Sequence, residues 1–104
     1  MGQIDDLQRR TWQNKLAKKF NTTNVEREFN YTYAELAEAY EAYRKGSTTK
    51  ELGYELADTV IFIMSLAEMT GVDLETAILE KMTINENRTY VKTNGHFIKK
   101  KEKS

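Results

Sequence analysis

The chain contains no cysteine and no proline and has a single histidine. The lack of cysteine and the single histidine exclude several kinds of metal site and catalytic site. Without cysteine there are no disulfides, no thiolate metal sites and no cysteine nucleophiles. One histidine, His96, excludes histidine-rich metal sites and most histidine-based triads within one subunit. The 16 basic and 16 acidic residues balance, so no global charge indicates nucleic acid or an anionic membrane as a partner.

Long hydrophobic runs are also missing. The sequence has no stretch of about 18 apolar residues, the length that a membrane-spanning helix needs. The first ten residues, MGQIDDLQRR, lack the apolar core of a signal peptide, and Asp6 stands where a myristoylation site requires Ser or Thr. We therefore expect a soluble, cytoplasmic protein. Its 104 residues predict one small domain that would gain stability from association.

The sequence pattern predicts an all-α chain of four helices. We expect them at residues 4–20, at a second stretch that starts between 25 and 33 and ends near 45, at 49–70, and from 74 to about 90. Thr48 and Asp73 are the expected N-caps, and Gly71 is an expected stop. Short connections predict an antiparallel four-helix bundle or a close relative. Residues 1–91 form the predicted domain, and residues 92–104, rich in lysine, a basic and mobile tail.

Two carboxylates interrupt an otherwise apolar helix. In YELADTVIFIMSLAEM, Glu55 and Asp58 are three residues apart and share one face of the helix. A helix that is apolar nearly all round is central to the fold or is also covered by a second subunit. Neither carboxylate is then easily placed wholly in solvent.

The preceding helix repeats this pattern with Glu35 and Glu38. If the two helices pack antiparallel, both pairs face each other, and four carboxylates in a partly buried cleft repel one another. A hard divalent cation such as Mg²⁺ resolves that repulsion, because it takes carboxylate oxygens and leaves positions for water and phosphate. The sequence therefore predicts a metal site between these two helices.

The fourth predicted helix carries polar residues that suit a phosphate chain. Lys81, Asn85 and Arg88 follow one another at spacings of four and three, which places them on one face. Simpler interpretations also exist. Glu35 would form a capping box with Thr32, the other acids and this stripe would be solvated, and Glu55 and Asp58 would complement the helix dipole.

These residues carry a resemblance to a known family. ELAEAYEAYRKG, followed by ELGYELADTVIFIMSLAEMTGVDLETAILEKMTINENRTY, resembles the MazG-like all-α nucleotide pyrophosphohydrolases. The family pattern is Glu-x-x-Glu, a gap, Glu-x-x-Asp, and then a lysine and Asn-x-x-Arg on the next helix. The match covers residues 33–90, more than half of the chain. Ala34 departs from it, because the family often has a further glutamate there.

The resemblance implies a Mg²⁺-dependent enzyme, with Mn²⁺ as a possible substitute, that cleaves a (deoxy)nucleoside triphosphate between the α and β phosphates. The products are the monophosphate and pyrophosphate. It also implies a homo-oligomer, with a dimer as the minimal unit and a tetramer plausible, and a nucleotide as the partner rather than nucleic acid or membrane. The residue roles it implies are metal binding by Glu35, Glu38, Glu55 and Asp58, general-base catalysis by Glu35 or Glu38, and phosphate binding by Lys81, Asn85 and Arg88. Aromatic candidates for the base pocket are Trp12, Phe29, Tyr31 and Tyr33.

Two other classes of protein fit part of the pattern. A carboxylate-bridged di-iron bundle needs Glu-x-x-His pairs, and His96 lies outside the predicted helices. A catalytically silent binding or assembly module of the same fold is the stronger alternative, because a fold does not imply an activity. The sequence does not reveal the preferred base or sugar.

Overall fold

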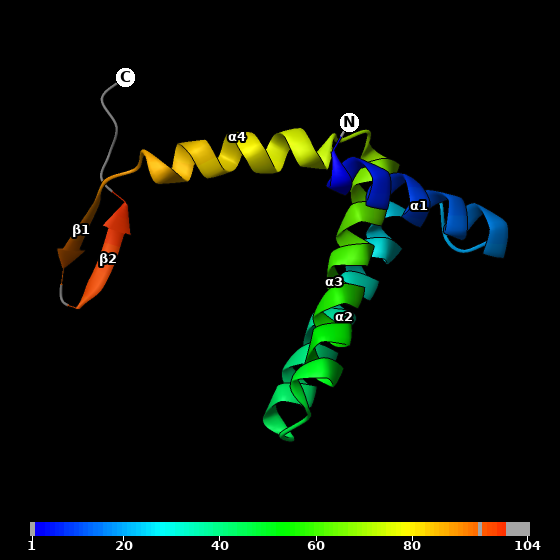
Figure 1. Cartoon of the computed structure of the whole chain (residues 1–104), viewed down its shortest axis with the longest axis horizontal. Helices are drawn as coiled ribbons and strands as arrows, with labels where there is room; N and C mark the ends of the chain where they lie inside the picture. The colour runs from blue at the N-terminus through cyan, green and yellow to red at the C-terminus, as the bar shows by residue number, and fades with distance from the viewer. Residues whose placement is uncertain (1, 94, 100–104) are drawn as a thin grey trace.

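The computed structural model describes residues 2–93 and 95–99 (Figure 1). The described chain has four helices followed by a short hairpin, which confirms the all-α prediction for the domain. Its elements are α1 (Gln3–Lys18), α2 (Val25–Arg44), α3 (Thr49–Thr70), α4 (Leu74–Glu86), β1 (Tyr90–Thr93) and β2 (His96–Lys99). None of the described helices is long and apolar enough to cross a membrane.

Local sequence sets both ends of α3 and the start of α4, as predicted. Thr48 and Glu51 form a reciprocal capping box at the start of α3. The Asp73 side chain accepts a hydrogen bond from the Thr76 N–H and opens α4. Gly71 closes α3 in the left-handed conformation, with φ of 74°, which glycine adopts without steric cost.

The core lies between α2 and α3, which run antiparallel to each other (Figure 1). The helix α1 packs across α3, so α3 is the central helix. Among the side chains that the structure describes, the buried apolar ones are Ala39, Met64, Leu66 and Ala67. This core is small for a chain of 104 residues.

The fourth helix does not close a bundle within the single chain. Instead α4 leads away from the α2–α3 pair, and none of its residues is buried (Figure 1). Its first turn is tied to α1, because the Glu75 carboxylate accepts hydrogen bonds from the N–H groups of Ile4 and Asp5 at 3.0 and 3.4 Å. The chain exposes 8344 Å², whereas a compact monomer of this mass exposes about 6,000 Å².

The C-terminal region differs from the sequence prediction. Helix α4 ends at Glu86 rather than near Tyr90, and β1 and β2 pair antiparallel with Tyr90 opposite Lys99. The segment assigned to a mobile tail from Lys92 onward therefore starts inside β1. The missed signal is the Asn-Gly pair at 94–95, typical of two-residue hairpins, in which Gly95 has φ of 80°. Residues 100–104 lie outside the described residues.

Candidate functional site

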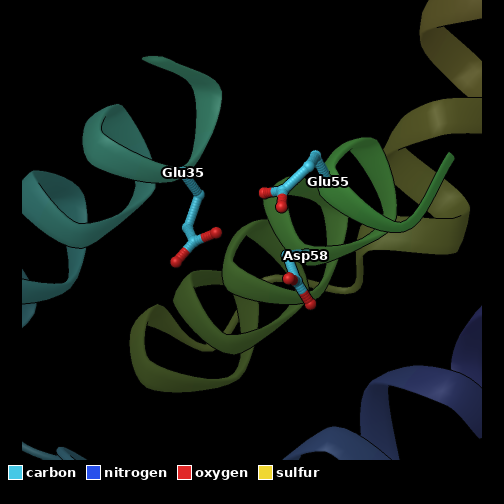
Figure 2. A group of neighbouring side chains, drawn as sticks. All are labelled: Glu35, Glu55 and Asp58. Carbon is cyan, nitrogen blue, oxygen red and sulfur yellow. The ribbon is translucent and has the colours of Figure 1, made fainter. Parts of the chain in front are cut away.

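Three carboxylates from two helices meet at the α2–α3 interface. Glu35 projects from α2 toward Glu55 and Asp58 on α3 (Figure 2). One carboxylate oxygen from each residue lies within 4.8 Å of the other two. The three-residue spacing and the antiparallel pairing of the helices produce this cluster, as the sequence predicts.

The cluster is electrostatically unfavourable without a cation. Burial and then the neighbouring charges of Glu38, Asp58 and Glu55 raise the pKa of Glu35 above its ordinary value. The buried Glu55 Oε2 has no hydrogen-bond partner. Within residues 2–89 no lysine or arginine forms an ion pair with these acids. Unpaired carboxylate oxygens are the ligands that Mg²⁺ or Mn²⁺ prefers, so the donor set fits such an ion.

Two further glutamates on α2 behave differently from each other. Glu38 is exposed and lies beside Glu35, close enough for a side-chain hydrogen bond between the two carboxyl groups. It is not one of the three residues whose oxygens converge. Glu41 instead pairs with Arg44 at 2.9 Å on the surface. The capping-box interpretation of Glu35 is excluded, since Thr32 lies in the middle of α2.

The predicted phosphate-binding residues do not reach the carboxylates within one chain. Lys81 and Asn85 lie on α4, which leads away from the site, and Arg88 lies beyond the end of the helix (Figure 1). Arg88 nevertheless stays beside Asn85, because its Nη1 donates a hydrogen bond to Asn85 Oδ1 at 3.1 Å. These residues therefore form their own group at the far end of α4.

A cavity of about 1070 Å³ lies further along α2 and α3, and none of the three clustered acids lines it. Glu28 is seven residues before Glu35, and Ser65 is seven residues after Asp58, so each lies on the same helix face about two turns along. The lining residues come from α1, the loop after it, α2 and α3. Among them are the cationic residues Arg10, Lys19 and Arg27 and the aromatic residues Phe20, Tyr31 and Phe62.

Of the aromatic residues proposed for a base pocket, only Tyr31 lines this cavity. Its ring packs edge-on against Phe62 with ring centroids 6.0 Å apart. Phe29 and Tyr33 line a separate groove, and the partly buried Trp12 lines neither. The structure therefore favours Tyr31, and a substrate contact by Trp12 stays a prediction.

A buried ionic network forms one wall of the cavity. The Lys15 ammonium donates to Glu28 Oε2 at 2.5 Å and to Ser65 Oγ at 2.6 Å. Ser65 Oγ donates to Glu28 Oε2, and Asn21 donates to Glu28 Oε1. The sequence analysis missed this network. Gln8 and Lys15 are seven residues apart, so they share one face of α1, and the structure buries both. Apolar periodicity does not reveal this face, because both residues are polar.

Repulsion in the cluster leads to a stability prediction. Replacing Glu35 by glutamine removes one of the clustered charges, so in EDTA we expect the melting temperature to rise. A gain of about 0.5 kcal/mol, typical of a relieved like-charge pair, corresponds to about 2–4 °C in a domain of this size. Mg²⁺ should raise the melting temperature of the unchanged protein but not of Glu35→Gln. Thermal unfolding followed by circular dichroism measures both, and a Mg²⁺ response that survives the substitution would contradict the assignment.

Comparison with known proteins gives one partial match. A protein named dATP/dGTP diphosphohydrolase from Salmonella phage PMBT28 is 42% identical to this chain over 48 residues. The match covers 42% of this chain but 17% of the relative, so the chain spans only a small part of that protein. No family model matches the chain, and no solved structure matches it either.

Proposed function

We propose that this protein is a Mg²⁺-dependent nucleoside triphosphate pyrophosphohydrolase, which converts a (deoxy)nucleoside triphosphate into the monophosphate and pyrophosphate. The observation that carries the proposal is the group of Glu35, Glu55 and Asp58, whose carboxylate oxygens lie within 4.8 Å of one another. A cavity of about 1070 Å³ begins about one helical turn away along α2 and α3. The partial relative named dATP/dGTP diphosphohydrolase supports a nucleotide as the substrate class.

The positions of the carboxylates indicate two roles, metal binding and general-base catalysis. Glu35, Glu55 and Asp58 would hold Mg²⁺ (or Mn²⁺), with Glu38 as a further ligand at the exposed edge. When bound, the ion neutralises phosphate charge and lowers the pKa of a coordinated water. Of the two general-base candidates, we favour Glu38, because it is exposed and lies outside the converging group of three. Its free oxygen can accept the proton of the attacking water.

The nucleoside would occupy the neighbouring cavity. Its volume suits a ligand of this size, since small-molecule sites typically measure about 300–1,000 Å³. Tyr31 and Phe62 supply aromatic surface for the base, and the lining cations Arg10, Lys19 and Arg27 favour a polyanionic ligand. The phosphates would then extend along α2 and α3 toward the carboxylates. Phosphate binding by Lys81, Asn85 and Arg88 stays a prediction, because α4 leads away from this site within one chain.

We also propose a homo-oligomer with a dimer as the minimal unit. The radius of gyration is 17.0 Å, whereas a compact domain of this length has about 13 Å. Many large apolar side chains also stay exposed on α2, α3 and α4, and exposed apolar surface of this kind often marks an interface. Such an interface would leave out residues 64–67, which are buried inside the chain. Its exposed apolar candidates are Leu36, Tyr40, Leu56, Val60, Ile63, Leu79 and Met82.

The reaction itself provides the direct test. With Mg²⁺ we expect at least one triphosphate in a panel of canonical and modified nucleotides to yield monophosphate and pyrophosphate in equal amounts. Chromatography separates these products from diphosphate and inorganic phosphate, and EDTA should stop turnover because the carboxylates then lose their ion. Release of diphosphate nucleotide, or turnover insensitive to EDTA, would contradict the proposal. Nucleotide binding without turnover would favour the silent binding module.

A further inference from the structure

Three cations line the large cavity without an anionic partner. Arg10 lies on α1, Lys19 follows the last turn of α1, and Arg27 lies on α2. All three are exposed, and within residues 2–89 none of them forms an ion pair. Guanidinium and ammonium groups that share one cavity attract anions and donate charge-assisted hydrogen bonds to them.

The cavity wall does not supply an anion that balances these cations. Among the lining residues that the structure describes, Glu28 is the one acid, and the Lys15 ammonium and the Ser65 hydroxyl already bind its carboxylate. The other lining side chains are apolar, aromatic, or neutral amides and hydroxyls. Three positive charges are therefore available to a ligand.

Two of these cations lie at the end of the cavity away from the carboxylate cluster. On α2, Tyr31 is the lining residue nearest to Glu35 and precedes it by one helical turn. Arg27 lies eight residues before Glu35, about 12 Å along the helix axis. Lys19 lies in the connection that leads into the start of α2, near the same end. A phosphate chain held at the carboxylates would therefore leave these cations to the opposite end of the ligand.

We propose that the substrate carries a second phosphate group, on the 3′ oxygen of its sugar, which Arg10, Lys19 and Arg27 bind. This inference rests on the proposed function and names the class of substrate. With the 5′ phosphates at the carboxylates and the base against Tyr31 and Phe62, the sugar lies between them, and its 3′ phosphate meets the cations. The cavity of about 1070 Å³ is at the upper end of the usual range for small-molecule sites, which suits this larger ligand.

A pair of isomers tests the proposal without any catalysis. Adenosine 3′,5′-bisphosphate and adenosine 5′-diphosphate carry the same number of phosphates, but only the bisphosphate has one on the 3′ oxygen. Isothermal titration calorimetry in EDTA measures both, together with the corresponding pairs of guanosine, cytidine and uridine. For the base that binds most tightly, the dissociation constant of the bisphosphate should be lower by about tenfold or more. Equal affinity for the two isomers with every base would overturn the inference.

Substitution of the cations should remove this preference. In the double variant Arg10→Gln, Arg27→Gln both side chains stay polar but lose their charge, and circular dichroism should show an unchanged helical content because both positions are exposed. The matched control is Lys18→Gln, Lys45→Gln, which removes two charges from exposed positions that do not line the cavity and should keep the preference. A preference that survives in the Arg10→Gln, Arg27→Gln variant would also contradict the proposal.

A dinucleotide identifies the source of the 3′ phosphate, which belongs either to a free nucleotide or to the first nucleotide of an oligonucleotide. In 5′-phosphoadenylyl-uridine the 3′ phosphate continues into a second nucleoside. Binding within about threefold of the bisphosphate would identify an oligonucleotide end as the ligand. Binding weaker by about tenfold or more would identify the free nucleotide, because the cations then require a terminal phosphate.

These titrations separate the inference from the proposed function, because they need neither metal nor turnover. If triphosphates are hydrolysed but no bisphosphate is preferred, the proposed function stands and this inference is wrong. If no triphosphate is hydrolysed but the preference is present and is lost in the Arg10→Gln, Arg27→Gln variant, the proposed function fails. The cavity then remains a binding site for nucleotides with a 3′ phosphate.

Discussion

Replacing Asp58 by asparagine is expected to lower Mg²⁺-dependent turnover by about a hundredfold or more while leaving the helical fold intact. Asparagine keeps the shape of the side chain but removes the charge that a hard cation requires. Asp58 is exposed and contributes one of the three converging oxygens, so the loss falls on the metal rather than on packing. Effects of this size or larger follow the loss of residues that hold or orient a catalytic metal.

The same assay on Glu41→Gln provides the matched control. Glu41 lies on the same helix as Glu35 and Glu38, but its carboxylate binds Arg44 on the surface. An exposed pair of this kind contributes about 0–1 kcal/mol to stability and nothing to the site, so turnover should change less than twofold. Near-normal activity of Asp58→Asn at saturating Mg²⁺ would show that the site assignment is wrong. Circular dichroism of both variants separates lost chemistry from lost structure.

Breaking the Lys15–Glu28 pair is expected to have the largest effect on folding. Both side chains are nearly inaccessible, at 8% and 1% exposure. Glu28→Gln leaves the Lys15 ammonium buried without a countercharge, which typically costs about 3–5 kcal/mol of unfolding free energy. Urea titration measures this loss. The double variant Lys15→Met, Glu28→Leu should recover much of it, because an apolar pair leaves no uncompensated charge.

Acid conditions should reduce the difference between Glu28→Gln and the unchanged protein. Burial acts to raise the pKa of Glu28, but hydrogen bonds from Lys15, Ser65 and Asn21 outweigh it and lower the pKa below its ordinary value of 4.5. A lowered folded pKa means that the stabilisation is complete above about pH 4.5 and is lost as the pH falls through the folded pKa. The exposed Glu26 is the control, and Glu26→Gln should stay within about 0.5 kcal/mol at every pH. A loss for Glu28→Gln that grows on acidification would contradict this account.

Local chemistry made both ends of α3, the start of α4 and the carboxylate cluster predictable from the sequence. The capping box of Thr48 and the glycine at Gly71 depend on neighbours three or four residues away. The convergence of Glu35 with Glu55 and Asp58 needs only two facts, their helical spacing and a short antiparallel connection. The hairpin was missed although its Asn-Gly signal was present, because the lysine-rich composition suggested a solvated tail.

The sequence by itself determined four helices, the caps of α3 and α4 and the acidic faces of α2 and α3, because each of these depends on interactions within a few turns of the chain. Only the tertiary structure decided which charged residues are buried. Lys15 and Glu28 are thirteen residues apart, and their pairing depends on how α1 crosses the α2–α3 pair. The direction of α4 also depends on the tertiary structure, because the contact of Glu75 with the start of α1 joins residues about seventy positions apart in the sequence. That contact holds Lys81 and Arg88 away from the acids of their own chain, and no local pattern records it.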